Sequence, residues 1–224
     1  MAEGVVAHAD HGHHPDLQHQ FSTLSQQHEA ATLGMWIFLV TEVMFFGGMF
    51  TAYMLYRIWY PEGWIEGSNA LNIIQGGVNT GVLIGSSLTM AMAVRSAQTG
   101  MRKGTMVWLV LTMVLGLTFL VIKGFEYHTK WVLGEVPGLH FTLNGPFANQ
   151  EEIFFSLYFA MTGLHALHMV IGFGILSTIL WMAHKGRFSR EWYTPVEMSG
   201  LYWHFVDIVW IFLFPLLYLV DRHV

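Results

Sequence analysis

The chain has 224 residues, of which 54% are hydrophobic, 15% aromatic and only 11% charged. An ordinary soluble domain carries about 25% charged residues, so the composition excludes a conventional water-soluble globule. Ten Lys and Arg against 15 Asp and Glu give a formal net charge of -5, and no basic cluster supplies the electrostatic footprint that nucleic-acid binding needs. The absence of Cys excludes disulfides, iron-sulfur clusters and thiolate-bridged copper, so any metal would need His, Met or carboxylate ligands.

Residues 1–28 form a polar segment without Lys or Arg. The segment lacks the apolar content that offsets the entropy of ordering, so we expect a disordered cytoplasmic tail, although His-rich tracts also bind metal ions loosely. It has none of the features of a secretory signal peptide, and the first hydrophobic segment is expected to stay in the membrane. The six His residues of the tail are His8, His11, His13, His14, His19 and His28.

The rest of the chain, residues 29–224, is predicted to be one membrane domain. Its apolar segments are each longer than the roughly 20 residues that cross the hydrocarbon core as a helix. They run over Glu29–Ile58, Leu71–Val94, Thr105–Tyr127, Glu152–Ala183 and Val196–Val220. The sequence therefore predicts an all-α polytopic membrane protein, a bundle of five transmembrane helices joined by short connections.

The distribution of basic residues predicts the orientation of the bundle. The second and fourth connections hold six of the ten basic residues, namely Arg95, Arg102, Lys103, Lys185, Arg187 and Arg190. The first connection is acidic, with Glu62 and Glu66. Because cytoplasmic loops carry an excess of Lys and Arg, we expect the N-terminus inside and the C-terminus outside.

Two features of the spans bear on helix packing. Gly77, Gly81 and Gly85 recur at four-residue intervals in the second span, a pattern that lets a neighbouring helix approach closely. Pro215 lies inside the fifth span, where it lacks the backbone N–H of a regular helix and is expected to cause a kink.

Placing an ionisable group inside a membrane costs free energy, so each such residue suggests a functional role. Glu42 lies near the middle of the first span; it either makes a structural hydrogen bond to another helix or is a protonatable group coupled to proton traffic or to a partner subunit. Lys123 and Glu126 lie three residues apart, on one helix face, and predict either an ion pair or a site for a lipid headgroup.

The last two spans each contain a pair of ionisable residues that includes histidine. His165 and His168 are three residues apart, and the same spacing separates His204 from Asp207. Hydrogen bonds between helices are the favoured role, while a bis-His haem held by His168 and His204, or one metal held by the three His and Asp207, are alternatives. The sequence contains no arrangement typical of a self-contained catalytic site.

The spans also carry motifs that are specific in combination. The first contains GMWIFLVTEVMFF over residues 34–46, the third KGFEY over 123–127, the fourth FFSLYFAMTGLHALH over 154–168 and the fifth YWHFVDIVW over 202–210. These segments resemble subunit III of the haem-copper cytochrome c oxidases, and the resemblance covers roughly residues 28–222.

The resemblance implies an accessory subunit without redox centres, in an assembly that passes electrons from cytochrome c to dioxygen and pumps protons across a bacterial inner membrane. Haems and copper would belong to partner subunits, the catalytic subunit I and the copper-bearing subunit II. Subunit III of this family stabilises the catalytic subunit, supports proton uptake and binds phospholipid. Glu42 matches the buried glutamate of the family, and its other intramembrane polar positions match Glu126, His165, His168, His204 and Asp207, which implies lipid contact and inter-helix hydrogen bonding.

One departure concerns the number of spans. Longer members of the family have seven, and their first two helices form one wall of a lipid cleft. This chain starts its membrane part at what would be the third helix, so the wall would have to come from another chain. Five-span subunits also occur in quinol oxidases, which is the alternative function; Glu42 and the WHFVD string favour the cytochrome c branch.

Overall fold

The computed structural model describes residues 17–138, 141 and 146–219. The described part of the chain contains helices and no strand. Six α-helices and a final π-helix follow one another along the chain. They are α1 (Leu24–Trp59), α2 (Pro61–Asn69), α3 (Ile73–Gln98), α4 (Arg102–Val132), α5 (Ala148–His184), α6 (Thr194–Phe214) and η1 (Pro215–Leu219).

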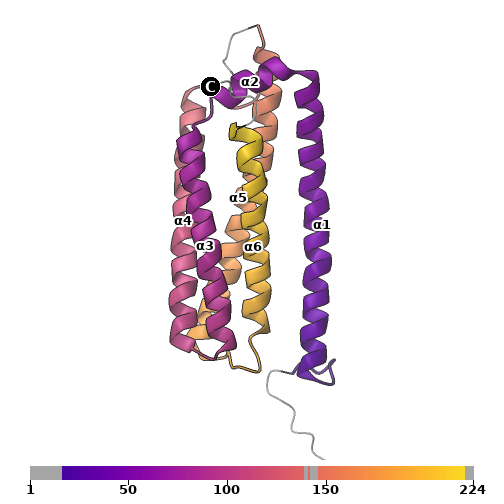
Figure 1. The fold of residues 1–224 in the computed structure, drawn as a ribbon, viewed down its shortest axis with the longest axis vertical. Coiled ribbons are helices and arrows are strands. Elements are labelled where there is room, and N and C mark those ends of the chain that lie inside the picture. The colour runs from indigo at the N-terminus through magenta and orange to yellow at the C-terminus, as the bar shows by residue number, and fades with distance from the viewer. Residues whose placement is uncertain (1–16, 139–140, 142–145, 220–224) are drawn as a thin grey trace, which may run out of the picture.

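Five of these helical segments are long and apolar enough to cross a membrane, as the sequence predicts. They stand side by side in an up-and-down bundle, with α1 beginning at one end and η1 ending at the other (Figure 1). Large apolar side chains cover the outside of the bundle, including Val107, Leu117 and Phe125 on α4. An apolar exterior is the surface that a lipid-embedded bundle presents to acyl chains. The chain is a multi-pass membrane protein.

The helix ends follow from local sequence signals. Thr23 caps α1 by accepting a hydrogen bond from the backbone N–H of Gln26, so the helix begins five residues before the predicted start at Glu29. The ends of α3, α4 and α5 each have a glycine with positive φ, a conformation that closes a helix with little steric cost in glycine. These glycines are Gly100, Gly134 and Gly186.

The first connection contains a short helix, where the sequence predicted only a short connection. The helix α2 starts with Pro61 at its first turn, where the missing N–H of proline costs nothing. Gly67 lies so close to Phe154 of α5 that a β-carbon would come within 2.4 Å of the ring. The helix α2 therefore packs closely against the beginning of α5.

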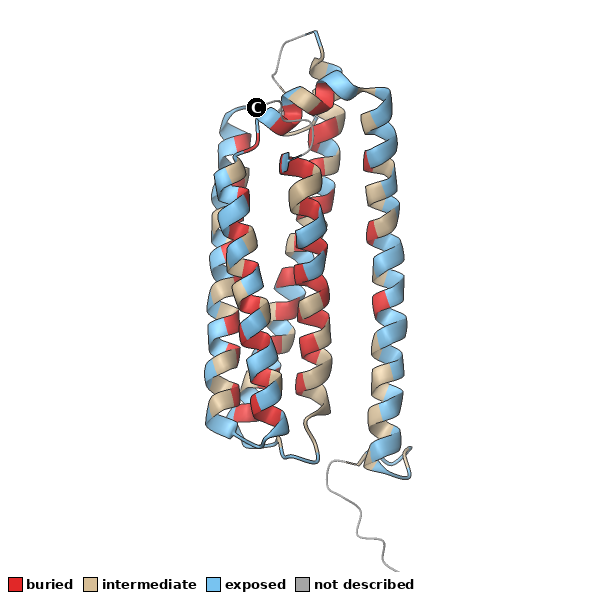
Figure 2. Ribbon diagram, viewed as in Figure 1, coloured by how far each residue is buried: buried red, intermediate tan, exposed pale blue. Residues whose placement is uncertain are grey.

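The helices of the bundle are buried to very different degrees (Figure 2). In the most apolar stretch of 18 residues of each span, 56% of the residues are buried in the α6–η1 segment, compared with 11% in α1. The buried residues of α1 are Leu39, Phe46 and Tyr53, at seven-residue spacing and thus on one face. The helix α6 packs against α1, α3 and α5, and α1 stands at the edge of the bundle.

One sequence prediction about packing needs correction. A β-carbon on Gly81 would meet nothing within 4 Å, and Gly77 and Gly85 have only ordinary contacts, so the predicted close approach at this stripe does not occur within this chain. The tight contact is instead at Gly76, against Phe214. At Pro215 the α-helix ends and continues as the π-helix η1, because proline cannot donate the next α-helical hydrogen bond.

Candidate functional site

Three polar contacts at different depths hold α1 against the bundle. His28 Nδ1 lies 3.1 Å from Thr194 Oγ1 at the start of α6. The Glu42 carboxyl lies 3.1 Å from His168 Nε2 in the middle of α5. The hydroxyl of Tyr53 donates to the carbonyl oxygen of Leu216 in η1 at 2.6 Å. Because α1 buries few apolar side chains, these contacts set its position.

The contact between Glu42 and His168 involves one shared proton. His168 Nδ1 lies 2.8 Å from the carbonyl oxygen of Leu164, an acceptor, so Nδ1 carries a hydrogen. Nε2 then either accepts the proton of a neutral Glu42 carboxyl or donates to a Glu42 carboxylate as part of an imidazolium ring. Either form joins α1 to α5 in the middle of the bundle, as the sequence predicted for a hydrogen bond between helices.

Lys123 and Glu126 form a buried ion pair with an Nζ–Oε2 distance of 3.0 Å. Lys123 Nζ also donates to the hydroxyls of Tyr158 and Tyr218, each at 2.9 Å. Both hydroxyls then donate to Glu126 Oε1, at 2.7 Å and 2.5 Å. All three hydrogens of the ammonium group are therefore used inside the bundle, which favours the ion pair over a site for a lipid headgroup.

His165, three residues before His168 on α5, bonds to a different helix. Its Nε2 lies 3.1 Å from the carbonyl oxygen of Val206 on α6, and its ring packs against those of Phe119 and Trp210. His165 and His168 are only three residues apart, yet one contacts α6 and the other α1.

The polar residues of α6 face α3. His204 Nδ1 lies 2.7 Å from Ser87 Oγ, and the indole N–H of Trp203 donates to Ser86 Oγ at 2.8 Å. Asp207 is 2% exposed, and neither of its carboxyl oxygens has a hydrogen-bond partner among the described residues. The α3–α6 interface therefore combines satisfied hydrogen bonds with one buried carboxyl group.

An apolar groove lies between residues 36–50 of α1 and residues 201–212 of α6. Its volume is about 460 Å³. The α1 wall includes Phe46 and Gly47, and the α6 wall includes His204 and Phe212. A groove of this composition inside a membrane suits an acyl chain, because apolar walls offer no partner to a polar ligand.

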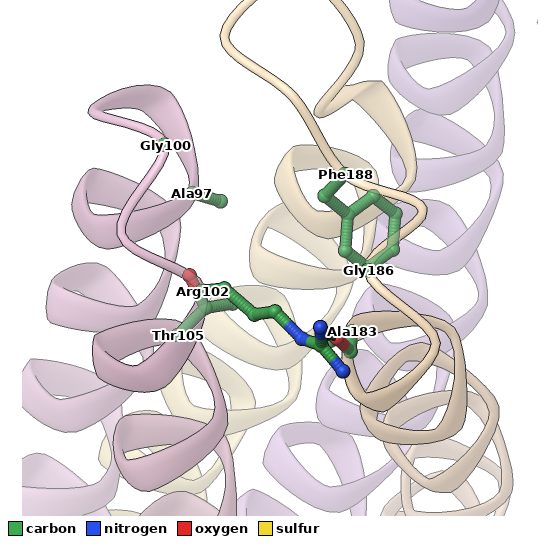
Figure 3. Close-up of a pocket in the computed structure, with 7 residues that line it drawn as sticks. All are labelled: Ala97, Gly100, Arg102, Thr105, Ala183, Gly186 and Phe188. Atoms are coloured by element: carbon green, nitrogen blue, oxygen red, sulfur yellow. Dashed lines mark hydrogen bonds between the residues drawn. The ribbon is translucent and has the colours of Figure 1, made fainter.

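A small hollow lies between the start of α4 and the end of α5, where Arg102 lies against Gly186 and Phe188 (Figure 3). Its volume is about 10 Å³, roughly the space of one water molecule. Arg102 Nε donates to the carbonyl oxygen of Ala183 at 3.0 Å, so the side chain closes the end of α5. This hollow serves helix capping and is too small for a ligand.

The comparisons with known proteins agree with this arrangement. The family model described as cytochrome c oxidase subunit III matches residues 17–221. The chain belongs to the cytochrome c oxidase subunit III family. A protein named cytochrome c oxidase subunit 3 from Synechocystis is 34% identical over 216 residues, covering 96% of this chain and 80% of that protein.

Relatives with the same name come from distant organisms. One from Thermostichus vulcanus is 32% identical over 231 residues, covering 99% of this chain and 96% of the relative. One from Loxodonta africana is 32% identical and covers 85% of this chain and 69% of the relative. The subunit III resemblance inferred from the motifs is confirmed.

This subunit III chain brings together only some of the polar residues that the sequence singled out. Glu42 pairs with His168 and Lys123 with Glu126. His165 and His204 bond to separate partners, and Asp207 has no hydrogen-bond partner among the described residues. Within the described residues, no three His, Asp or Glu side chains are placed to hold a metal ion. His168 has both ring nitrogens in hydrogen bonds, so the arrangement does not favour it as a haem ligand.

Sequence reasoning missed several partners in this subunit III chain. Tyr158 and Tyr218 complete the Lys123 network, and Ser87 bonds to His204. Tyrosine is common near the ends of membrane spans, so the position of Tyr218 by itself does not indicate a buried network. Their spacing along the sequence carries no signal, because each bond joins helices that are far apart in the chain.

Proposed function

We propose that this chain is a non-redox accessory subunit of a proton-pumping terminal oxidase that passes electrons from cytochrome c to dioxygen. The observation that carries the proposal is that the intramembrane His, Lys and Glu side chains bond to one another, to tyrosine and serine hydroxyls and to backbone carbonyl groups within the bundle. Residues used in this way stabilise a bundle. The names of the relatives support cytochrome c as the electron donor over a quinol.

The redox chemistry belongs, in this proposal, to partner chains. Subunit I would hold the haems and a copper ion, and subunit II the second copper centre. The bundle would lie in a bacterial inner membrane with the N-terminal side cytoplasmic, as the excess of Arg and Lys in the α3–α4 and α5–α6 connections supports.

The Glu42–His168 pair is proposed to support proton uptake by the catalytic subunit. Its two side chains are 19% and 12% exposed in the isolated chain, so a partner subunit or a lipid can reach them. The pair holds one proton in the middle of the membrane and is neutral overall, unlike an isolated ion. Such groups are typical of proton-handling membrane proteins.

Phospholipid binding is proposed for the groove between α1 and α6. The groove is about 460 Å³ in volume with aromatic and aliphatic walls, and it opens to the membrane beside the weakly buried α1. An acyl chain there would replace the packing that α1 lacks. A wall from another chain would complete the enclosure, in keeping with the two helices that longer members have.

Purification through a tag on this chain, in mild detergent from its own membrane, tests the accessory role. Subunits are identified by mass spectrometry, and reduced-minus-oxidised spectra are recorded for the complex and for the separated chain. We expect larger chains to co-purify and to carry all the haem. Haem retained by the separated chain, and lost in His204→Ala, would overturn the proposal in favour of a bis-His cytochrome.

A further inference from the structure

A second hollow lies beside α6, on its α3 side and at the end of the bundle where α3 finishes and α6 begins (Figure 1). Its volume is about 430 Å³. Ala91, Val94 and Leu201 supply its apolar lining. The helices α3 and α6 approach closely here, since a β-carbon on Gly200 would come within 2.8 Å of Val94. Its rim is polar, with Arg95 and Gln98 on α3 and Glu197 on α6.

The rim carries one positive and one negative group. Arg95 takes part in none of the ion pairs within the described residues. Glu197 has a buried Oε2 that lacks a hydrogen-bond donor, and the imidazole Nε2 of His28 lies 3.8 Å away, beyond hydrogen-bond distance. A guanidinium binds phosphate oxygens well, and a carboxylate accepts hydrogen bonds from an ammonium group.

The hollow connects with the apolar groove between α1 and α6. Leu201 and His204 line both. Along α6, residues 197, 201, 204, 208 and 212 are spaced by three or four, so they form one stripe from the charged rim to Phe212 in the groove. At 1.5 Å per residue the stripe is about 22 Å long, longer than the roughly 15 Å of one hydrocarbon leaflet.

We propose that Arg95 and Glu197 bind the headgroup of a zwitterionic aminophospholipid, such as phosphatidylethanolamine, whose acyl chain follows α6 into the groove. Arg95 contacts the phosphate, and Glu197 accepts a hydrogen bond from the primary ammonium group. Phosphatidylglycerol offers Glu197 no cation, and a choline headgroup offers no N–H donor. The inference rests on the proposed lipid-binding role and adds the headgroup site and its selectivity.

The test uses the whole oxidase complex, delipidated in detergent and reconstituted in nanodiscs with equal amounts of phosphatidylethanolamine, phosphatidylcholine and phosphatidylglycerol. Lipids that stay bound after re-extraction are quantified by mass spectrometry. We expect phosphatidylethanolamine to be retained in preference to the other two. Arg95→Gln should lower its retention about tenfold, because a charge-assisted hydrogen bond is lost, and Arg95→Lys should keep most of it.

Glu197→Gln should abolish the preference for phosphatidylethanolamine over phosphatidylcholine while total lipid changes little. Lys103→Gln is the matched control, an exposed basic residue at the same end of the bundle that does not line the hollow. Equal retention of the three lipids, or a preference for phosphatidylglycerol, would overturn the proposal. Co-purification with haem-bearing chains tests the accessory role separately, so each result can fail without the other.

Discussion

Glu42 on α1 and His168 on α5 lie 126 residues apart in the sequence, and their side chains meet at 3.1 Å in the middle of the bundle. The contact fixes a helix that is otherwise weakly packed, because only Leu39, Phe46 and Tyr53 of α1 are buried. A change at either residue should therefore affect first how α1 packs against the bundle.

For Glu42→Ala, we expect haem content close to wild type with a lower stability of the subunit and faster loss of activity during turnover. Removing the carboxyl leaves His168 Nε2 unpartnered, at a cost of about 1–3 kcal/mol. Pyridine haemochrome spectra and the decay of oxygen consumption measure the two effects. Glu42→Gln, which retains a hydrogen-bond donor, is the control, and complete loss of haem in Glu42→Ala would contradict the prediction.

The Lys123 network predicts strong coupling between two substitutions. Lys123→Met leaves the buried carboxylate of Glu126 without its cation, which should cost about 3–5 kcal/mol. Lys123→Met combined with Glu126→Gln removes both charges and should be less damaging than Lys123→Met alone. Thermal unfolding of the purified complex, arranged as a double-mutant cycle, measures the coupling. Additive effects of the two substitutions would show that no ion pair stabilises the bundle.

Adjacent glycines on α1 provide a matched pair for the groove. Gly47 lines the groove, Gly48 is exposed and does not, and a β-carbon at either would meet nothing within 4 Å. Gly47→Trp should fill the groove and lower the amount of co-purified phospholipid, whereas Gly48→Trp should leave it unchanged. Lipid phosphorus per haem is the measurement. Equal lipid content in the two variants would argue against an acyl chain in this groove.

Gly186→Ala is expected to destabilise the chain by about 1–2 kcal/mol, the usual cost of a left-handed conformation for a residue with a β-carbon. Gly186 has φ +70, and the added methyl would lie 3.1 Å from Arg102 Nη1. Gly174→Ala, in the interior of α5 with open space around it, should instead stabilise by about 0.5–1 kcal/mol. Thermal midpoints of the two variants should move in opposite directions; movement in the same direction would contradict the role of φ.

Much of the fold follows from the sequence alone. The five spans, the predominance of helix and the family are all determined by segments of about 20 or more apolar residues and by local motifs such as YWHFVDIVW. The physical reason is that a membrane forces each apolar segment to satisfy its backbone hydrogen bonds internally, so length and composition decide the secondary structure before any packing is known.

Tertiary structure decided which polar groups meet. His165 and His168 lie three residues apart in the sequence, but the packing of the helices decides that His165 contacts Val206 and His168 contacts Glu42. It also decided that Gly76 rather than Gly77, Gly81 or Gly85 is in tight contact, since the choice depends on which face of α3 turns toward α6. Contacts between helices join residues far apart in the chain, and their geometry depends on side-chain shape on both surfaces, which spacing along one helix does not encode.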